Sequence, residues 1–214
     1  MPATTIMPER KLASLILFNK AVVKWLTRRS NDLLNLKGRP MARLLVLRHG
    51  KTEIVSKSGE DFDRELVSRG IRNSTDMGAL LRRHMPRPEM VMVSPAKRTR
   101  QTAHHVLSTL APDIEPVIDD RIYNASGDTL FEVLTDYAHD CKTAMFVGHN
   151  PGMILLIQMM LAAEDEHLFA TVADYPTCTL TDLVFDADTI GDIKPGQGKL
   201  LSLLRPREIG FNPA

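Results

Sequence analysis

The sequence is poor in cysteine and has no hydrophobic run long enough to cross a membrane. Its two cysteines, Cys141 and Cys178, are not arranged as C-x-x-C. A disulfide framework or a zinc site is therefore not expected, and two free thiols are typical of a reducing compartment, which favours a cytoplasmic location. No stretch reaches the roughly eighteen apolar residues that a membrane-spanning helix needs. With 43% hydrophobic and 25% charged residues, the 214 residues are expected to fold into one globular domain with at most a short appendage.

The main body of the chain also lacks a basic run interleaved with aromatic residues. The net charge of +1 conceals an asymmetry, because residues 1–40 hold eight Lys or Arg and two acids, which leaves 19 Lys or Arg against 24 acids in residues 41–214. The main body is therefore mildly acidic. We do not expect nucleic acid as a partner.

Residues 1–40 are expected to form a basic N-terminal extension ahead of a domain at 41–214. Apolar residues such as Leu15, Phe18 and Val22 recur there at helical spacing, with lysines and arginines on the other face, which predicts an amphipathic helix. Three interpretations of this segment remain open. The helix contacts a membrane surface, it docks on a protein, or the segment is an extension translated ahead of a start at Met41. A secretory signal is disfavoured because the apolar stretch is short and is interrupted by polar residues.

From Met41 onward, short apolar runs alternate with amphipathic stretches. Near-continuous apolar runs of strand length occupy residues 43–47, 90–93 and 144–147. Helical patterns occupy residues 68–85, 97–110, 127–139 and 153–161, the last apolar nearly all round and therefore expected to be buried. Further strands are predicted at residues 114–118, 179–185 and 199–204. This βα alternation predicts a three-layer α/β/α sandwich whose sheet is mostly parallel, with an antiparallel edge strand.

Three of the predicted strands end in a polar cluster. The clusters are Arg48-His49-Gly50, the segment from Ser94 to Arg98, and the segment from Gly148 to Gly152. Because ligands bind beyond the carboxyl ends of parallel strands, the three clusters are expected to face one crevice. Ser94-Pro95 is typical of a helix start, with serine as the N-cap and proline at the first helical position, and Asn150-Pro151 opens the next helix in the same way.

The clustered side chains favour binding of a phosphate dianion. Backbone N–H groups at helix starts, together with the guanidiniums of Arg48 and Arg98, are suited to grip its oxygens. A neutral imidazole can attack phosphorus, and positive neighbours keep a histidine neutral, so we assign nucleophilic attack to His49. Arg48, Arg98 and His149 are then expected to hold the phosphoryl oxygens during transfer. We expect no metal ion and no cofactor.

These residues resemble the histidine phosphatase superfamily, which is also called phosphoglycerate-mutase-like. The R-H-G signature matches Arg48 to Gly50, the S-P-x-x-R-x-x-Q-T-A element matches Ser94 to Ala103, and G-H-N-P matches Gly148 to Pro151. The resemblance implies that His49 is phosphorylated and that Arg48, Arg98 and His149 bind phosphate. The segment from Asp61 to Gly70 is similar to a D-x-x-R-x-L-x-x-x-G element of the SixA-like phosphohistidine phosphatases.

One departure from the superfamily bears on the substrate. Many members carry a glutamate acid/base after the third strand, where this chain has residues 121–125 without a carboxylate. Protonating an alkoxide leaving group normally needs such an acid, whereas an N–P bond has less need of one. Three acids are possible substitutes: Asp63, Asp128 and Glu132. The expected partner is a phosphohistidine protein or a small phosphorylated metabolite. The alternatives are a phosphoglycerate-mutase-type transfer and a binding module without turnover, and the oligomeric state is left open.

Overall fold

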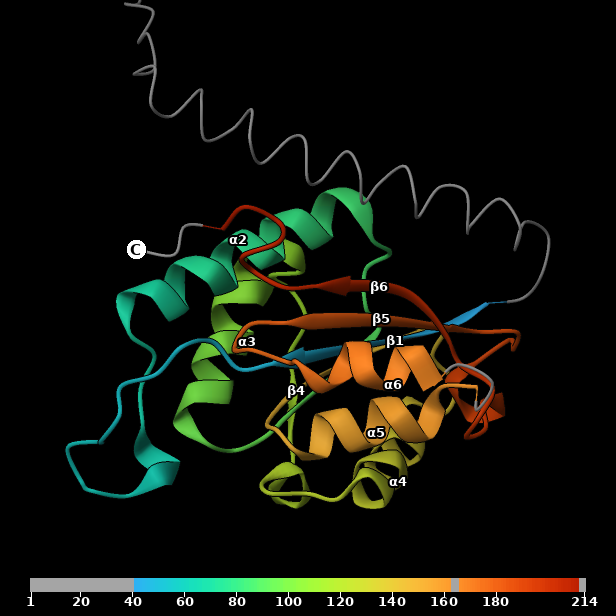
Figure 1. Cartoon of the computed structure of the whole chain (residues 1–214), viewed down its shortest axis with the longest axis horizontal. Helices are drawn as coiled ribbons and strands as arrows, with labels where there is room; N and C mark the ends of the chain where they lie inside the picture. Colours follow the sequence, from blue (N-terminus) through green and yellow to red (C-terminus); the bar gives the residue numbers. More distant parts are fainter. Residues whose placement is uncertain (1–40, 163–165, 212–214) are drawn as a thin grey trace, which may run out of the picture.

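The computed structural model describes residues 41–162 and 166–211. The amphipathic helix predicted within residues 1–40 lies outside the described residues. Within the described part, six strands form one sheet in the order β3-β2-β4-β1-β5-β6 (Figure 1). No described helix has both the length and the apolar character needed to span a membrane.

The sheet is mostly parallel, with two antiparallel strands at one edge. The parallel strands are β1 (Ala42–Arg48), β2 (Met90–Val93), β3 (Val117–Ile118) and β4 (Thr143–Gly148). The antiparallel ones are β5 (Leu180–Phe185), which pairs with β1, and β6 (Lys199–Leu204), which pairs with β5. The mixed sheet confirms the prediction and places the antiparallel pair at the C-terminal end of the chain.

Helices cover both faces of this sheet, which gives the predicted three layers (Figure 1). One face carries α2 (Ser68–His84) and α3 (Lys97–Leu110). The opposite face carries α4 (Gly127–Ala138), α5 (Gly152–Met160) and α6 (Glu166–Ala173). Short 3-10 helices η1 (Asp61–Asp63), η2 (Asp120–Ile122) and η3 (Ile190–Asp192) lie in the connections.

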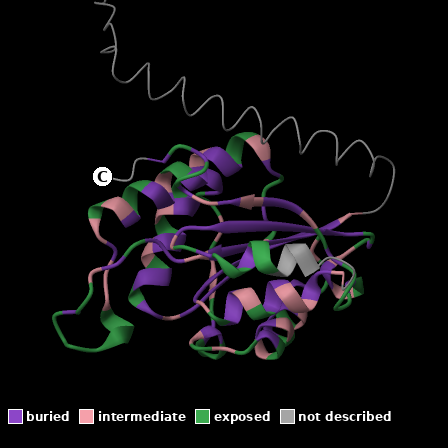
Figure 2. Cartoon of the chain, viewed as in Figure 1, coloured by how far each residue is buried: buried purple, intermediate pink, exposed green. Residues whose placement is uncertain are grey.

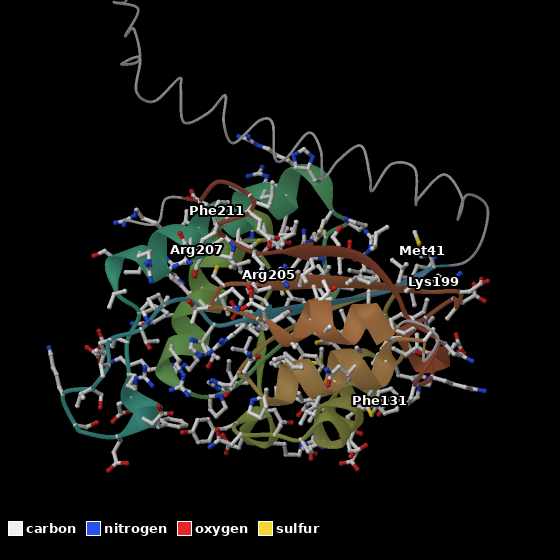
Figure 3. The ribbon with its side chains drawn as sticks, in the orientation of Figure 1. Met41, Phe131, Lys199, Arg205, Arg207 and Phe211 are labelled. Atoms are coloured by element: carbon white, nitrogen blue, oxygen red, sulfur yellow. The ribbon has the colours of Figure 1, made fainter. Side chains whose placement is uncertain are left out.

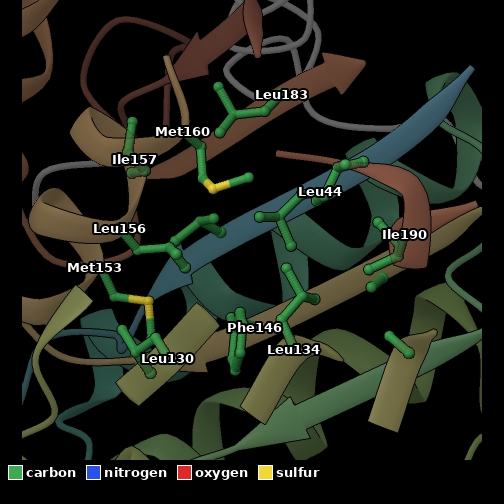
Figure 4. Close-up of a cluster of buried hydrophobic side chains, with 14 of the residues drawn as sticks. Leu44, Leu130, Leu134, Phe146, Met153, Leu156, Ile157, Met160, Leu183 and Ile190 are labelled. Carbon is green, nitrogen blue, oxygen red and sulfur yellow. The ribbon is translucent and has the colours of Figure 1, made fainter. Parts of the chain in front are cut away.

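The central strand β1 is buried on both sides, as its continuous apolar sequence predicts. Leu44 and Val46 face the core under α4 and α5, whereas Leu45 and Leu47 face the core under α2 and α3. Figure 2 shows the strands of the sheet buried almost throughout, and Figure 4 shows side chains of α4 and α5 packed over Leu44 and the β4 residue Phe146. A rigid, doubly covered sheet is what fixes the positions of the loops at its edge.

Two sequence predictions need correction. The strand expected at residues 114–118 is reduced to Val117–Ile118, because a turn at residues 112–113 precedes it and only these two residues pair with β2. Within α5, Leu155 is 46% exposed, so this helix is not buried all round. The tail after Arg205 is irregular, yet Ile209 and Phe211 belong to the core beneath α2, and Figure 3 shows Phe211 beside that helix.

Candidate active site

The sheet register brings the first and last polar clusters together. Arg48, the last residue of β1, pairs with Gly148, the last residue of β4, so His49 and His149 follow at the same level. The centroids of the two imidazole rings are 5.3 Å apart. Strand β2 ends alongside β4, with Val93 paired to Val147, which delivers the third cluster to the same edge. The predicted convergence of Arg48, His49, Arg98 and His149 is therefore present in the structure.

His49 is buried and its ring orientation is fixed by a backbone carbonyl. Its Nδ1 atom lies 2.8 Å from the carbonyl oxygen of Gly50, and because a carbonyl can only accept, Nδ1 carries the hydrogen and donates it. Burial lowers the pKa of His49 to about 4, against the effect of the Gly50 bond, and the charges of Arg98, Arg48 and Arg64 lower it further. At neutral pH the ring is therefore uncharged, and its lone pair is on Nε2.

His149 is held through both ring nitrogens. The Nε group of Arg98 donates to Nδ1 at 3.2 Å, so Nε2 carries the hydrogen and donates to the hydroxyl oxygen of Ser94 at 2.7 Å. Burial is the main reason that the pKa of His149 falls to about 3, and the neighbouring charge of Arg98 adds to it. Both pocket histidines are neutral, but they are opposite tautomers.

The Ser94 contact corrects the predicted helix start. The helix α3 begins at Lys97, Ala96 is its N-cap residue and no side chain caps it. Ser94 lies before the helix and is fully buried, so its hydroxyl is used by His149 instead of by the helix. A Ser-Pro pair is a capping signal in sequence, but here the serine serves the site. The second predicted start is shifted likewise, since α5 begins at Gly152 with Pro151 as the N-cap residue.

Arg48 presents a buried hydrogen-bond donor with no partner. Its Nη1 group donates to the carbonyl oxygen of Tyr175 at 2.6 Å, and the side-chain amide of Asn150 donates to the same oxygen at 3.1 Å. The Nε atom of Arg48 is buried and makes no hydrogen bond. An unpaired buried donor is costly, which is the condition expected at a site that an anion fills. Burial also lowers the pKa of Arg48 from its usual range.

Arg98 is 5% exposed and is bound by a residue that the sequence did not single out. Its Nη1 group donates to the backbone carbonyl of Asp61 at 2.6 Å, and its Nη2 group donates to the Oδ2 atom of the same residue at 2.8 Å. The phenol of Tyr123 also donates to this Oδ2 atom at 3.1 Å, and the other carboxylate oxygen accepts from Arg64 at 2.8 Å. Asp61, Arg64 and Tyr123 therefore complete the site.

Tyr123 follows η2 and faces the pocket from residues 121–125, the segment in which the sequence has no carboxylate. Its ring meets the ring of His149 edge to face, with centroids 5.5 Å apart. The three acids suggested as substitutes do not fill that place. Asp63 accepts from Ser58, and both Asp128 and Glu132 are exposed on α4.

A side-chain hydroxyl ties the loop after β1 to the helix α3. The N–H group of Gly50 donates to the hydroxyl of Thr102 at 2.9 Å, and that hydroxyl donates to the carbonyl of Arg98 at 2.7 Å. A single threonine thus links the loop that follows His49 to the first turn of α3.

Among the described residues, no three His, Cys, Asp or Glu side chains gather in a way that could hold a metal ion.

Comparison with known proteins places this geometry in a family. The sequence pattern of the histidine phosphatase superfamily (branch 1) matches residues 44–139, which include Arg48, His49 and Arg98. Over this stretch the chain is similar to the histidine phosphatase superfamily. The match and the structural similarities below identify it as a phosphatase with a histidine nucleophile.

Solved structures similar to this histidine phosphatase include two candidate SixA phosphohistidine phosphatases. The one from Agrobacterium tumefaciens is 27% identical, with a TM-score of 0.63 over 78% of this chain and 99% of the other. The one from Nakamurella multipartitia is 22% identical, with a TM-score of 0.67 over 78% and 96%. In sequence, an uncharacterized protein of Mycobacterium tuberculosis is 28% identical over 150 residues, which is 69% of this chain and 92% of the relative.

Proposed function

We propose that this phosphatase hydrolyses phosphohistidine in a protein, with His49 as the nucleophile. The tautomer of His49 carries the proposal: Nδ1 donates to Gly50, so the lone pair of Nε2 is available to attack phosphorus. Arg48, Arg98 and His149 bind the phosphoryl oxygens in this proposal. The buried, unpaired Nε group of Arg48 supports that role, because it has a hydrogen bond left to donate.

The reaction takes two displacements. In the first, Nε2 of His49 attacks phosphorus, the N–P bond of the substrate breaks, and the electron pair of that bond returns to the leaving imidazole. In the second, water attacks the phosphorus of phosphorylated His49, the Nε2–P bond breaks with its electron pair returning to Nε2, and a proton of the water passes to solvent as inorganic phosphate leaves. Each step is an in-line transfer that needs positioned positive charge more than covalent help from the protein.

The carboxylate at the pocket favours a nitrogen leaving group over an alkoxide. Asp61 is the acid that contacts Arg98, and although partial burial alone would raise its pKa, hydrogen bonds from Arg64 and the charge of Arg98 lower it to about 2. Asp61 is therefore ionised at neutral pH and holds no proton to give an alkoxide. A phosphohistidine ring that is protonated on its other nitrogen leaves as neutral imidazole without such a donor.

Rapid quenching with a ³²P-labelled phosphohistidine peptide tests the nucleophile. We expect an acid-labile, base-stable label on the wild-type protein and none on His49→Ala. The matched control is His104→Ala, which removes an exposed histidine of α3 and is expected to label normally. Label on His49→Ala, or turnover by wild type without any labelled protein, would remove His49 as the nucleophile.

A panel of substrates tests the proposed leaving group. Phosphohistidine peptide, phosphoserine peptide, 3-phosphoglycerate and an aryl phosphate are compared by kcat/KM with the full chain. We expect phosphohistidine peptide to exceed phosphoserine peptide by about 100-fold or more, the scale of a general-acid contribution. Preference for a small metabolite over the peptide would instead assign this site to a phosphometabolite.

A further inference from the structure

The carboxylate of Asp61 lies between two arginines at the proposed phosphate pocket. One oxygen accepts from Arg98 and from the phenol of Tyr123, and the other accepts from Arg64. Asp61 belongs to η1, 37 residues away from Arg98 in sequence, so the contact is made by the fold and not by local geometry. Charge-assisted bonds of this kind are about twice as strong as neutral ones, so the network has a defined shape.

Asp61 occupies the part of Arg98 that a phosphoryl group would also use. One N–H bond of each terminal nitrogen of this guanidinium points at the carbonyl or the carboxylate of Asp61, while its Nε group points at His149. The side chain of Arg98 is 6% exposed and that of Asp61 is 51% exposed, so the acid lies on the solvent side of the pair. A carboxylate in that position both orients the arginine and competes with an incoming anion for its donors.

Asp61 offsets one of the three positive charges around the pocket. Arg48, Arg64 and Arg98 each carry a positive charge, the two histidines are neutral, and Asp61 is ionised. The net positive charge of these groups therefore equals the two negative charges of inorganic phosphate. Without the carboxylate the pocket would hold one unbalanced positive charge close to the bound product, and in a partly buried site such a charge acts strongly.

We propose that Asp61 is a positioning residue that orients Arg98 and weakens the binding of product phosphate enough for it to leave. This inference rests on the proposed function, because it needs phosphate to bind where His49 reacts. The backbone carbonyl of Asp61 contributes to the orientation of Arg98, and its side-chain charge contributes to release. The two contributions separate in Asp61→Asn, which keeps the carbonyl and an oxygen that can accept from Arg98 but loses the charge.

Inhibition by inorganic phosphate at pH 7 measures the effect of that charge. We expect the inhibition constant of Asp61→Asn to fall about tenfold, equal to about 1.4 kcal/mol. A variant with a damaged site would instead bind phosphate more weakly. The direction in which the inhibition constant changes therefore distinguishes an effect on product release from structural damage. We also expect kcat to fall while the single-turnover rate of His49 phosphorylation does not, because release becomes limiting.

The matched control is Asp63→Asn, which neutralises an acid two residues away that binds Ser58 and not the pocket. It should leave phosphate inhibition unchanged, and Asp61→Ser provides a second neutral side chain at position 61. An unchanged or raised inhibition constant in both Asp61 variants, with normal labelling of His49, overturns this inference alone. So does a loss of kcat on aryl phosphate with unchanged inhibition, which would make Asp61 a proton donor. Absence of label on wild-type His49 overturns the proposed function and this inference with it.

Discussion

The two pocket histidines are held through opposite ring nitrogens, and this difference is measurable. His49 donates from Nδ1 to a carbonyl, whereas His149 accepts at Nδ1 from Arg98 and donates from Nε2 to Ser94. We expect nitrogen NMR of the ¹⁵N-labelled protein at pH 7 to show the Nδ1–H tautomer for His49 and the Nε2–H tautomer for His149. The signals are assigned by their loss in His49→Asn and His149→Asn. The same tautomer for both rings, or a charged ring, contradicts this reading of the site.

The low pKa of His49 sets the acid limit of its reaction. Its pKa is lowered to about 4 by burial and by nearby arginines, and attack needs the neutral ring. The rate of phosphoenzyme formation should therefore stay nearly constant from pH 7.5 to pH 5, whereas an ordinary histidine would lose most of its neutral form below about pH 6.5. Single-turnover labelling across this range, corrected for spontaneous hydrolysis of the donor, checks the expectation. A fall of about fivefold between pH 6.5 and pH 5.5 would mean that His49 titrates normally.

The residues that the sequence identified are those that follow strands, and the residues it missed reach the site across loops. Arg48 is the last residue of β1, and His49 and His149 come directly after β1 and β4, where topology alone predicts convergence. Asp61 and Tyr123 reach the pocket from connections that have no periodic pattern, so no spacing in the chain links them to Arg98. The SixA-like segment that begins at Asp61 was the available signal, because it pointed to the right stretch without saying what the residue contacts.

At the scale of elements, a close contact between α2 and α3 supports the helix that carries Arg98. Gly78 of α2 packs against α3 so closely that an added Cβ would lie 2.3 Å from the carbonyl oxygen of Val106 and 2.2 Å from the hydroxyl of Thr109. Gly78→Ala would gain about 1 kcal/mol of helix propensity. It would also overpack the contact, at a cost of up to about 3 kcal/mol. We expect a net loss of stability of about 1–2 kcal/mol, measured by urea unfolding.

The control for this contact lies on the same helix. Arg83→Ala replaces an exposed residue of α2 and should change the free energy of unfolding by no more than about 0.5 kcal/mol. Equal stability of Gly78→Ala and wild type would mean that the helices separate at little cost.

Elements were predictable from sequence where burial on two faces leaves a continuous apolar run. The strands β1, β2 and β4 are of that kind, and their predicted positions agree with the structure to within one or two residues. The edge strand β3 is shorter than predicted because it has one partner, β2, and two paired residues. A run of apolar residues in the sequence indicates that a segment is buried, but it does not show that the segment pairs with a neighbouring strand. At the edge of a sheet an apolar segment can pack without being paired.

At the scale of the whole molecule, the same two histidines make stability depend on pH. Their pKa values in the folded protein are lowered to about 4 for His49 and about 3 for His149, from an ordinary value near 6.5. Between those limits the unfolded chain binds protons that the folded protein excludes, so the free energy of unfolding falls as pH falls from about 6.5 toward 4. Each excluded proton contributes a slope of up to about 1.4 kcal/mol per pH unit.

Removing both rings should flatten this dependence. We expect urea unfolding of His49→Asn/His149→Asn to show a shallower loss of stability between pH 6.5 and pH 4 than wild type, while His104→Asn keeps the wild-type slope. The lowered pKa of Asp61 acts in the same direction but only below about pH 4, so it lies outside the window. Phosphate must be absent from the buffers, because an anion bound to the folded state adds stability of its own. Equal slopes in the double variant and wild type would show that the rings are protonated in the folded protein and that the pocket is not the neutral-histidine site described above.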